Sequence, residues 1–108
     1  MVTVKLLDYV PHCYNAEDGQ IVRNLLLNRM AQDDSVIVSF KGVQSIPSSF
    51  VNTALISLLC TFSFSEIKRR LRFVDTNSQI NEMIRSRFDF ETNHRAREFE
   101  KTRLERSH

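Results

Sequence analysis

The chain has 108 residues and a formal net charge of +2, and only Gly19 and Gly42 are glycine. Average usage would place about seven or eight glycines in a chain of this length. A phosphate-binding loop needs two glycines ahead of a Lys-Ser/Thr pair, and a dinucleotide fingerprint needs about three in a short run. The sequence therefore excludes a P-loop enzyme and argues against a Rossmann cofactor domain. The small net charge gives no support of its own to nucleic-acid binding.

The length indicates one domain, and the cysteines and histidines indicate no metal or cofactor. A chain of this size buries one hydrophobic core. Cys13 and Cys60 form no CxxC pair, and the three histidines are scattered, so no metal site is expected. Cys60 lies in an apolar run and is expected to be buried. No secretory signal is visible, and the longest apolar stretch is about nine residues, half of a membrane span. We expect a cytoplasmic protein with no membrane contact.

Catalysis by a nucleophile requires a serine or cysteine with a histidine and an orienting acid in reach. Cys13 follows His12 in the sequence. Adjacent residues on a strand or loop often point apart, since side chains of an extended chain alternate in direction. We therefore predict no catalytic residue and no enzyme activity.

The first half of the chain predicts a strand, a helix and a second strand. Residues 2–10 are rich in β-branched and apolar side chains, as a strand is. A helix is expected over residues 15–31, because Asn15 is a good N-cap and acidic residues follow it. Gly19 inside that helix indicates close packing against another backbone. Residues 35–40 are nearly continuous in apolar side chains, which is typical of a central strand buried on both faces.

The second half predicts a helix, a strand and a final helix. Apolar residues at helical spacing over residues 48–62 indicate a helix that is mostly buried. Residues 63–67 are expected to form a loop, and residues 71–75 alternate in polarity as a strand does. Thr76 and Gln79 fit a capping box at the start of a third helix. This β-α-β-α-β-α order implies an α/β fold with a sheet of about four mostly parallel strands and helices packed on it.

The character of the chain changes near its C-terminus. Half of the last sixteen residues are charged, five basic and three acidic, and opposite charges recur at helical spacing. We assign residues 1–90 to the domain and residues 91–108 to a charged, helical C-terminal tail. Phe90 and Phe99 offer contacts through which the tail docks onto the domain or onto a second copy. Both a monomer and a homodimer are compatible with this pattern.

Three short motifs in the chain resemble those of a known family. They are Glu17-Asp18-Gly19 at a helix start, Phe40-Lys41-Gly42-Val43 at a strand end, and Asn77 with Met83-Ile84 in a late helix. In this order they resemble the STAS domains of anti-sigma-factor antagonists and sulphate transporters. The resemblance is closer to the small bacterial family of STAS-like domains, and it covers roughly residues 1–90. It implies a STAS-like sandwich that acts as a protein-binding, regulatory module.

The same resemblance implies a working surface at the start of the second helix. In anti-sigma-factor antagonists an ATP-binding partner kinase phosphorylates a serine there, within an Asp-Ser-Ser/Thr-Gly run. Ser48 and Ser49 match its two central positions, whereas Pro47 and Phe50 replace the Asp and the Gly. The expected partner contacts over residues 44–50 are Gln44, Ser48, Ser49 and Phe50. Ser48 is the phosphoacceptor candidate and Phe50 the apolar anchor. Serines beside a proline at a helix start are equally typical of ordinary capping.

A basic segment supports a second interpretation. Its residues are Lys68, Arg69, Arg70 and Arg72. Such a segment can bind nucleic acid or an acidic protein surface, although a solvated strand start is the simplest explanation. No aromatic side chain forms a stacking platform within it, so nucleic acid is not the expected partner. The alternatives are a nucleic-acid-associated regulator that uses residues 68–72 and the tail, and a binding component of a phage–host conflict system.

Overall fold

The computed structural model describes the backbone of residues 1–106 and the side chains of residues 1–93. Its elements in chain order are β1 (Val2–Lys5), η1 (Leu6–Asp8), α1 (Ala16–Gln32), β2 (Val36–Ser39), α2 (Ser48–Ala54), η2 (Ile56–Cys60), α3 (Phe64–Arg70), β3 (Leu71–Val74) and α4 (Ser78–Arg106). The two η elements are 3-10 helices. The chain is therefore a mixed α/β domain, as the sequence predicts.

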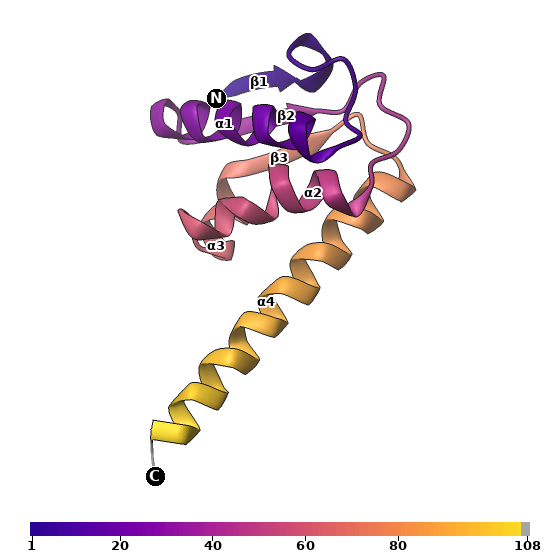
Figure 1. Cartoon of the computed structure of the whole chain (residues 1–108). Helices are drawn as coiled ribbons and strands as arrows, with labels where there is room; N and C mark the ends of the chain where they lie inside the picture. Colours follow the sequence, from indigo (N-terminus) through magenta and orange to yellow (C-terminus); the bar gives the residue numbers. More distant parts are fainter. Residues whose placement is uncertain (107–108) are drawn as a thin grey trace.

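The described residues form one parallel sheet in the order β1-β2-β3. It has three strands, so the expected number of about four is not reached. Helices α1 and α2 pack side by side along one face of this sheet (Figure 1). Val36 and Val38 of the central strand are buried, whereas Ile37, which points to the other face, is half-buried. Ser39, on the same face as Ile37, is buried, so the prediction that this strand is buried on both faces is wrong at Ile37, where the described helices leave the sheet partly open.

Helix α1 confirms the expected range and the expected role of its glycine. The Asn15 side chain accepts a hydrogen bond from the backbone N–H of Asp18, and the Asp18 side chain accepts one from Asn15 in return. A Cβ built on Gly19 would lie 2.8 Å from the Cβ of Thr53 and 3.1 Å from the carbonyl oxygen of Phe50. Only a glycine allows α1 and α2 to approach this closely, because any side chain would overlap α2.

Three predicted boundaries are wrong. The first strand ends at Lys5 rather than residue 10, because the chain turns into η1 there. The helix expected over residues 48–62 is divided into α2 and η2. The loop expected over residues 63–67 is instead the start of α3, since the Ser63 hydroxyl accepts a hydrogen bond from the Glu66 N–H at 3.2 Å and caps the helix. Three helical segments, rather than one, thus connect β2 to β3.

Helix α4 begins with a different cap from the one expected. Asn77, not Thr76, accepts a hydrogen bond from the backbone N–H of Ile80, at 2.9 Å. The helix runs to Arg106 in one piece. Phe90 is largely exposed and lies under the guanidinium of Arg87. The predicted contact through Phe99 falls outside the residues whose side chains are described, so docking of the tail stays a prediction.

Within the described residues, no single helix is long and apolar enough to cross a membrane. Two helical segments, Ser48–Cys60 and Phe64–Arg70, are long and apolar enough only when they are taken together, and the chain bends by 113° between them.

Candidate functional site

The loops that follow the three strands meet at one end of the sheet, which we call the carboxyl edge. Ligands of open parallel sheets characteristically bind at this end. A pocket of about 190 Å³ lies here, and the loop after β1 contributes His12, Cys13 and Tyr14 to its lining. The loop after β2 contributes Gln44 and Ser45. The carboxyl edge therefore brings together two segments that are thirty residues apart in the chain.

The loop after β2 is held by two side chains from the start of α4. The Gln79 side chain accepts a hydrogen bond from the Ile46 N–H at 3.0 Å and donates one to the Ile46 carbonyl at 2.9 Å. The Asn77 side chain donates to the Gln44 carbonyl at 2.7 Å. The Ile46 side chain is buried in the core below. These hydrogen bonds and the buried Ile46 side chain together hold the backbone of this loop in place.

The predicted contact residues divide into an exposed set and a buried one. Gln44, Ser48 and Ser49 are exposed, as a binding role requires. Pro47 occupies the N-cap position of α2, and no side chain makes a capping hydrogen bond there. The two serines therefore do not cap α2. Phe50 has no exposed surface and belongs to the hydrophobic core, so the prediction that it anchors a partner is wrong.

A hydrogen-bonded pair connects the ends of β2 and β3 at the same edge. The Ser39 hydroxyl donates to the Asp75 carboxylate at 2.6 Å and accepts from the Lys41 N–H at 3.3 Å. Asp75 has a φ of +56°, a left-handed conformation that is uncommon for a residue other than glycine. The hydrogen bond from Ser39 holds the side chain of this strained residue in place. Ser39 is buried, so this pair supports the loops from below.

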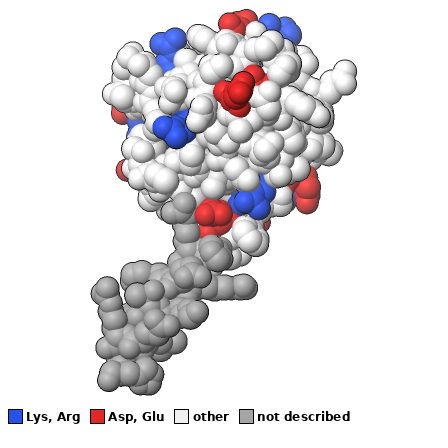
Figure 2. All heavy atoms as spheres, viewed as in Figure 1, with Lys and Arg blue, Asp and Glu red and all other residues white. Residues whose placement is uncertain are grey.

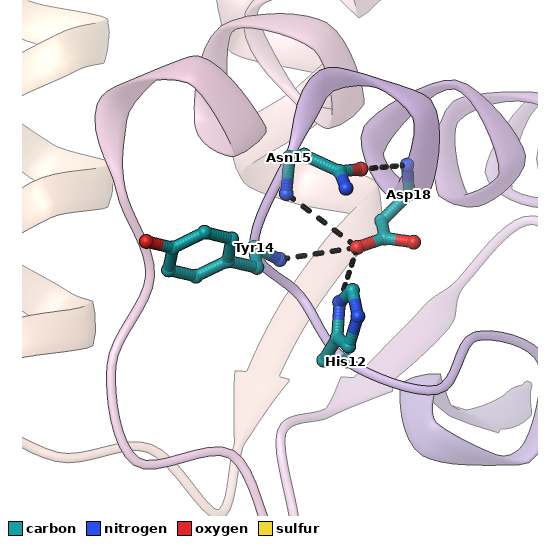
Figure 3. A network of polar contacts seen from close by, with 4 residues as sticks. All are labelled: His12, Tyr14, Asn15 and Asp18. Carbon is teal, nitrogen blue, oxygen red and sulfur yellow. Dashed lines mark hydrogen bonds and ion pairs between the residues drawn. The ribbon is translucent and has the colours of Figure 1, made fainter.

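A second polar network orders the loop before α1 (Figure 3). The Asp18 carboxylate lies 2.6 Å from the Nδ1 of His12 and also accepts weak hydrogen bonds from the backbone N–H groups of Tyr14 and Asn15, at 3.4 and 3.5 Å. Because an ionised carboxylate only accepts, Nδ1 carries the proton of this contact. The Asp18 side chain is 8% exposed and that of His12 is 57% exposed. His12 thus covers a buried carboxylate while more than half of its own side chain stays exposed.

The two cysteines differ in exposure, and Cys60 does not have the exposure that the sequence predicts. Cys13 is buried, whereas Cys60 is exposed at the end of η2. The expectation that Cys60 is buried is wrong because η2 replaces the continuous helix and turns this residue outward. Burial, followed by the nearby Asp18 charge, raises the pKa of the Cys13 thiol to about 12. A thiol with this pKa is almost entirely protonated near neutral pH, and only the thiolate reacts.

We therefore expect a thiol reagent to discriminate between the two cysteines. In the native protein at neutral pH, iodoacetamide should alkylate Cys60 and leave Cys13 unmodified, because Cys13 is both buried and protonated. In denaturant both residues should react. Peptide mass mapping after a timed alkylation measures the two yields. Equal labelling of both cysteines in the native protein would contradict the burial of Cys13.

The basic segment does not form one patch. The Arg70 guanidinium turns inward and donates to the backbone carbonyls of Met30, Asp33 and Asp34 at the C-terminal end of α1. A cation there also interacts favourably with the helix dipole. Arg70 is therefore a structural residue rather than a free contact for a ligand.

The other members of this segment point in different directions. Lys68 lies over the ring of Phe64, with its Nζ 5.3 Å from the ring centroid. Arg69 is exposed on α3, whereas Arg72 is exposed on the open face of the sheet. On the face seen in Figure 2, basic and acidic side chains are interspersed. This part of the surface lacks the single basic field that nucleic-acid binding characteristically needs.

Asn77 and Gln79 hold the loop after β2, a role that local sequence patterns do not predict. Each bonds to a residue 33 positions away in the chain. In the sequence Gln79 fits a capping box with Thr76, whereas Asn77 is the residue that caps α4 in the structure. A capping motif predicts hydrogen bonds between residues a few positions apart. It cannot predict a hydrogen bond between residues 33 positions apart.

Comparison with known proteins found one family match. The model of the STAS-like domain of unknown function (DUF4325) matches residues 18–81. This segment contains most of α1, the strands β2 and β3 with the three helical segments between them, and the start of α4. No curated protein and no solved structure matches the chain.

Proposed function

The chain belongs to the family of STAS-like domains, and we propose that it is a non-enzymatic regulatory module that binds a protein partner through its carboxyl edge. The contact surface consists of the exposed residues of the loop after β2 and of the start of α2. The implied partner is an ATP-binding, kinase-like regulator, as the resemblance to anti-sigma-factor antagonists indicates.

The observation that carries this proposal is the fixed backbone of the loop. Gln79 and Asn77 hold Ile46 and Gln44 through three hydrogen bonds of 2.7–3.0 Å. The loop is thus ordered while Gln44 and Ser45 remain exposed. A surface that is ordered before binding loses less conformational entropy when a partner docks, which favours affinity.

An aromatic side chain at the same pocket is suited to anchor the partner in place of Phe50. Tyr14 is 70% exposed and lines the pocket together with Gln44 and Ser45. A tyrosine offers a large apolar ring and a polar hydroxyl at a low cost in side-chain entropy, and tyrosines are enriched among the residues that dominate binding energy. We assign Tyr14 the anchoring role and the neighbouring polar side chains the hydrogen bonds around it.

A phosphate on Ser48 would act as the switch of this surface. Ser48 is exposed and makes no capping hydrogen bond, so a kinase can reach its hydroxyl without unfolding α2. A phosphoserine carries a charge of about −1.5 to −2 at neutral pH. Added to an uncharged contact surface, this charge would oppose binding to an acidic or apolar partner surface. The modification would therefore release the partner.

An affinity capture from the source cell tests the proposal directly. The full chain serves as bait, with and without ATP, beside the variant Ser45→Arg and the control Asn24→Arg on the exposed side of α1. A bulky charge in the contact surface should abolish capture of the partner, whereas the same charge on α1 should leave capture unchanged. Thermal unfolding of the three proteins verifies that each is folded.

Two outcomes would overturn the proposal. Capture of the same partner by Ser45→Arg at the wild-type level would show that the carboxyl edge is not the contact surface. Conversion of any substrate to product by the purified chain alone would contradict the proposal that this domain is a non-enzymatic binding module. The switch is tested separately, since intact-mass analysis of the chain from its native cell should show one phosphate that Ser48→Ala abolishes.

A further inference from the structure

The helix layer extends one element beyond the sheet. Helix α1 connects β1 to β2, and the α2–α3 segment connects β2 to β3. Helix α4 follows β3 and packs against α2 in the same layer. In the described part of the chain no strand follows α4. The position next to β3, above α4, is thus the place where a fourth strand of a parallel sheet would lie.

A groove occupies this position. It has a volume of about 280 Å³, and side chains of α3, β3 and α4 form its walls. Its apolar lining consists of Phe64, Ile67, Leu71, Phe73, Ile84 and Phe88. The rings of Phe64 and Phe88 stack with centroids 5.2 Å apart and close one side. We call this the β3 groove. Side chains of a strand beside β3 would point into it.

The backbone of β3 also offers hydrogen bonds along this edge. β3 pairs with β2 in the sheet of the described residues, and it is the last strand of that sheet. The Val74 carbonyl faces β2, because it accepts a hydrogen bond from the Phe40 N–H at 3.1 Å. Backbone groups of successive strand residues point to opposite edges, so the N–H and C=O of Phe73 face outward, above the groove. An added strand can pair with these groups as peptides do when they extend a sheet.

The rim of the groove carries charges of both signs, and a cation on β3 itself that is unpaired among the described residues favours an acidic partner. Lys68, Arg85, Asn81 and Asp89 lie at the rim. The Nζ of Lys68 is positioned over the Phe64 ring, whereas Arg85 pairs with Glu82 at 3.4 Å in a fully solvated contact. Arg72 lies on β3 itself and points to the open face. Side chains of an added strand that point away from the groove would stand beside Arg72, where an acidic residue is favoured.

The same charges disfavour a second copy of this chain as the occupant. Pairing β3 with β3 of another copy would place Arg72 beside Arg72 of that copy. Pairing β3 with the free edge of β1 would bring Lys5 next to the Arg72 side of the sheet. Like charges that stand side by side on neighbouring strands are destabilising. These like charges favour a different chain as the occupant.

We propose that the outer edge of β3 and the β3 groove bind an extended segment of a partner protein in which apolar residues alternate with acidic ones. The apolar residues fill the groove, the acidic residues stand beside Arg72, and the backbone pairs with Phe73. This surface lies on a different side of the domain from the loops of the carboxyl edge, so each proposal can fail without the other.

Synthetic peptides of about six to eight residues, the length of an ordinary strand, test this inference. The first alternates valine and glutamate, the second alternates valine and lysine, and the third contains the residues of the first in two blocks. Titration into the ¹⁵N-labelled full chain should shift the amide resonances of Leu71–Val74 with the first peptide only. The Phe73 amide should also exchange more slowly with solvent, because it becomes hydrogen-bonded.

A charge reversal supplies the matched control. Arg72→Glu should weaken binding of the glutamate peptide severalfold and favour the lysine peptide, whereas Lys5→Glu at the other edge of the sheet should change neither. Both positions are exposed, and the spectra of the free variants verify that they fold. Equal binding of the alternating and block peptides, or no binding of any peptide, would overturn the proposal. So would concentration-dependent self-association that broadens the Leu71–Val74 resonances, because the occupant would then be a second copy.

Discussion

Replacing Phe50 with alanine should lower the free energy of unfolding by about 3–5 kcal/mol. The side chain has no exposed surface and lies among the largest buried residues of the core. Its removal takes away the apolar contacts of a whole ring and leaves a cavity between α2 and its neighbours, which close-packed surroundings fill only in part. Urea denaturation followed by circular dichroism measures the change.

Ser49→Ala is the matched control for this substitution. Ser49 is the preceding residue on α2 and is exposed, so its replacement should change the stability by no more than about 0.5 kcal/mol. Comparison of the Phe50→Ala and Ser49→Ala variants shows whether Phe50 stabilises the core or contacts a partner. If Phe50→Ala retained wild-type stability but lost its partner in the capture experiment, Phe50 would be a contact residue and its burial would be incorrect.

Gly19→Val should destabilise the domain by about 1–3 kcal/mol, the usual cost of overpacking. A Cβ at this position would overlap the Thr53 Cβ at 2.8 Å and press on the Phe50 carbonyl at 3.1 Å. Both atoms belong to or adjoin the backbone of α2, so neither can move without shifting the helix. The helix propensity that valine gains over glycine, a few tenths of a kcal/mol, is too small to offset this.

Gln20→Val places the same side chain one residue further along α1 and serves as the control. Gln20 is exposed, so this variant should lose only a few tenths of a kcal/mol through the lower helix propensity of valine. Thermal and urea unfolding of both variants compare the two positions. An unchanged stability of Gly19→Val would mean that α1 and α2 do not approach as closely as described.

Local patterns predict the elements whose ends depend on nearby residues. Helix α1 has its expected range because Asn15 and Asp18 cap it within one turn. Strand β3 is likewise found where the alternation of polarity places it. The helix expected over residues 48–62 fails in its second half, since apolar periodicity alone does not distinguish an α-helix from a run of short helical turns.

The candidate site is predicted in part. The exposure of Gln44, Ser48 and Ser49 agrees with a binding surface, whereas the burial of Phe50 contradicts the expected anchor. Alignment with a family motif shows which positions correspond, but not which way a side chain points. Phe50 replaces a glycine of that motif, and a large apolar side chain at a helix start turns toward the core wherever the core has room for it.

The sequence by itself determined the α/β class, the family motifs, the range of α1 and the close approach at Gly19. Each of these follows from residue type and local spacing, although the sequence did not identify α2 as the element that Gly19 contacts. The tertiary structure alone decided that Gln79 fixes the loop at Ile46 and that Arg70 caps α1, since these hydrogen bonds join residues 33–40 positions apart. It also decided that the sheet ends at β3 beside an open groove, because the number of strands depends on pairing between distant segments.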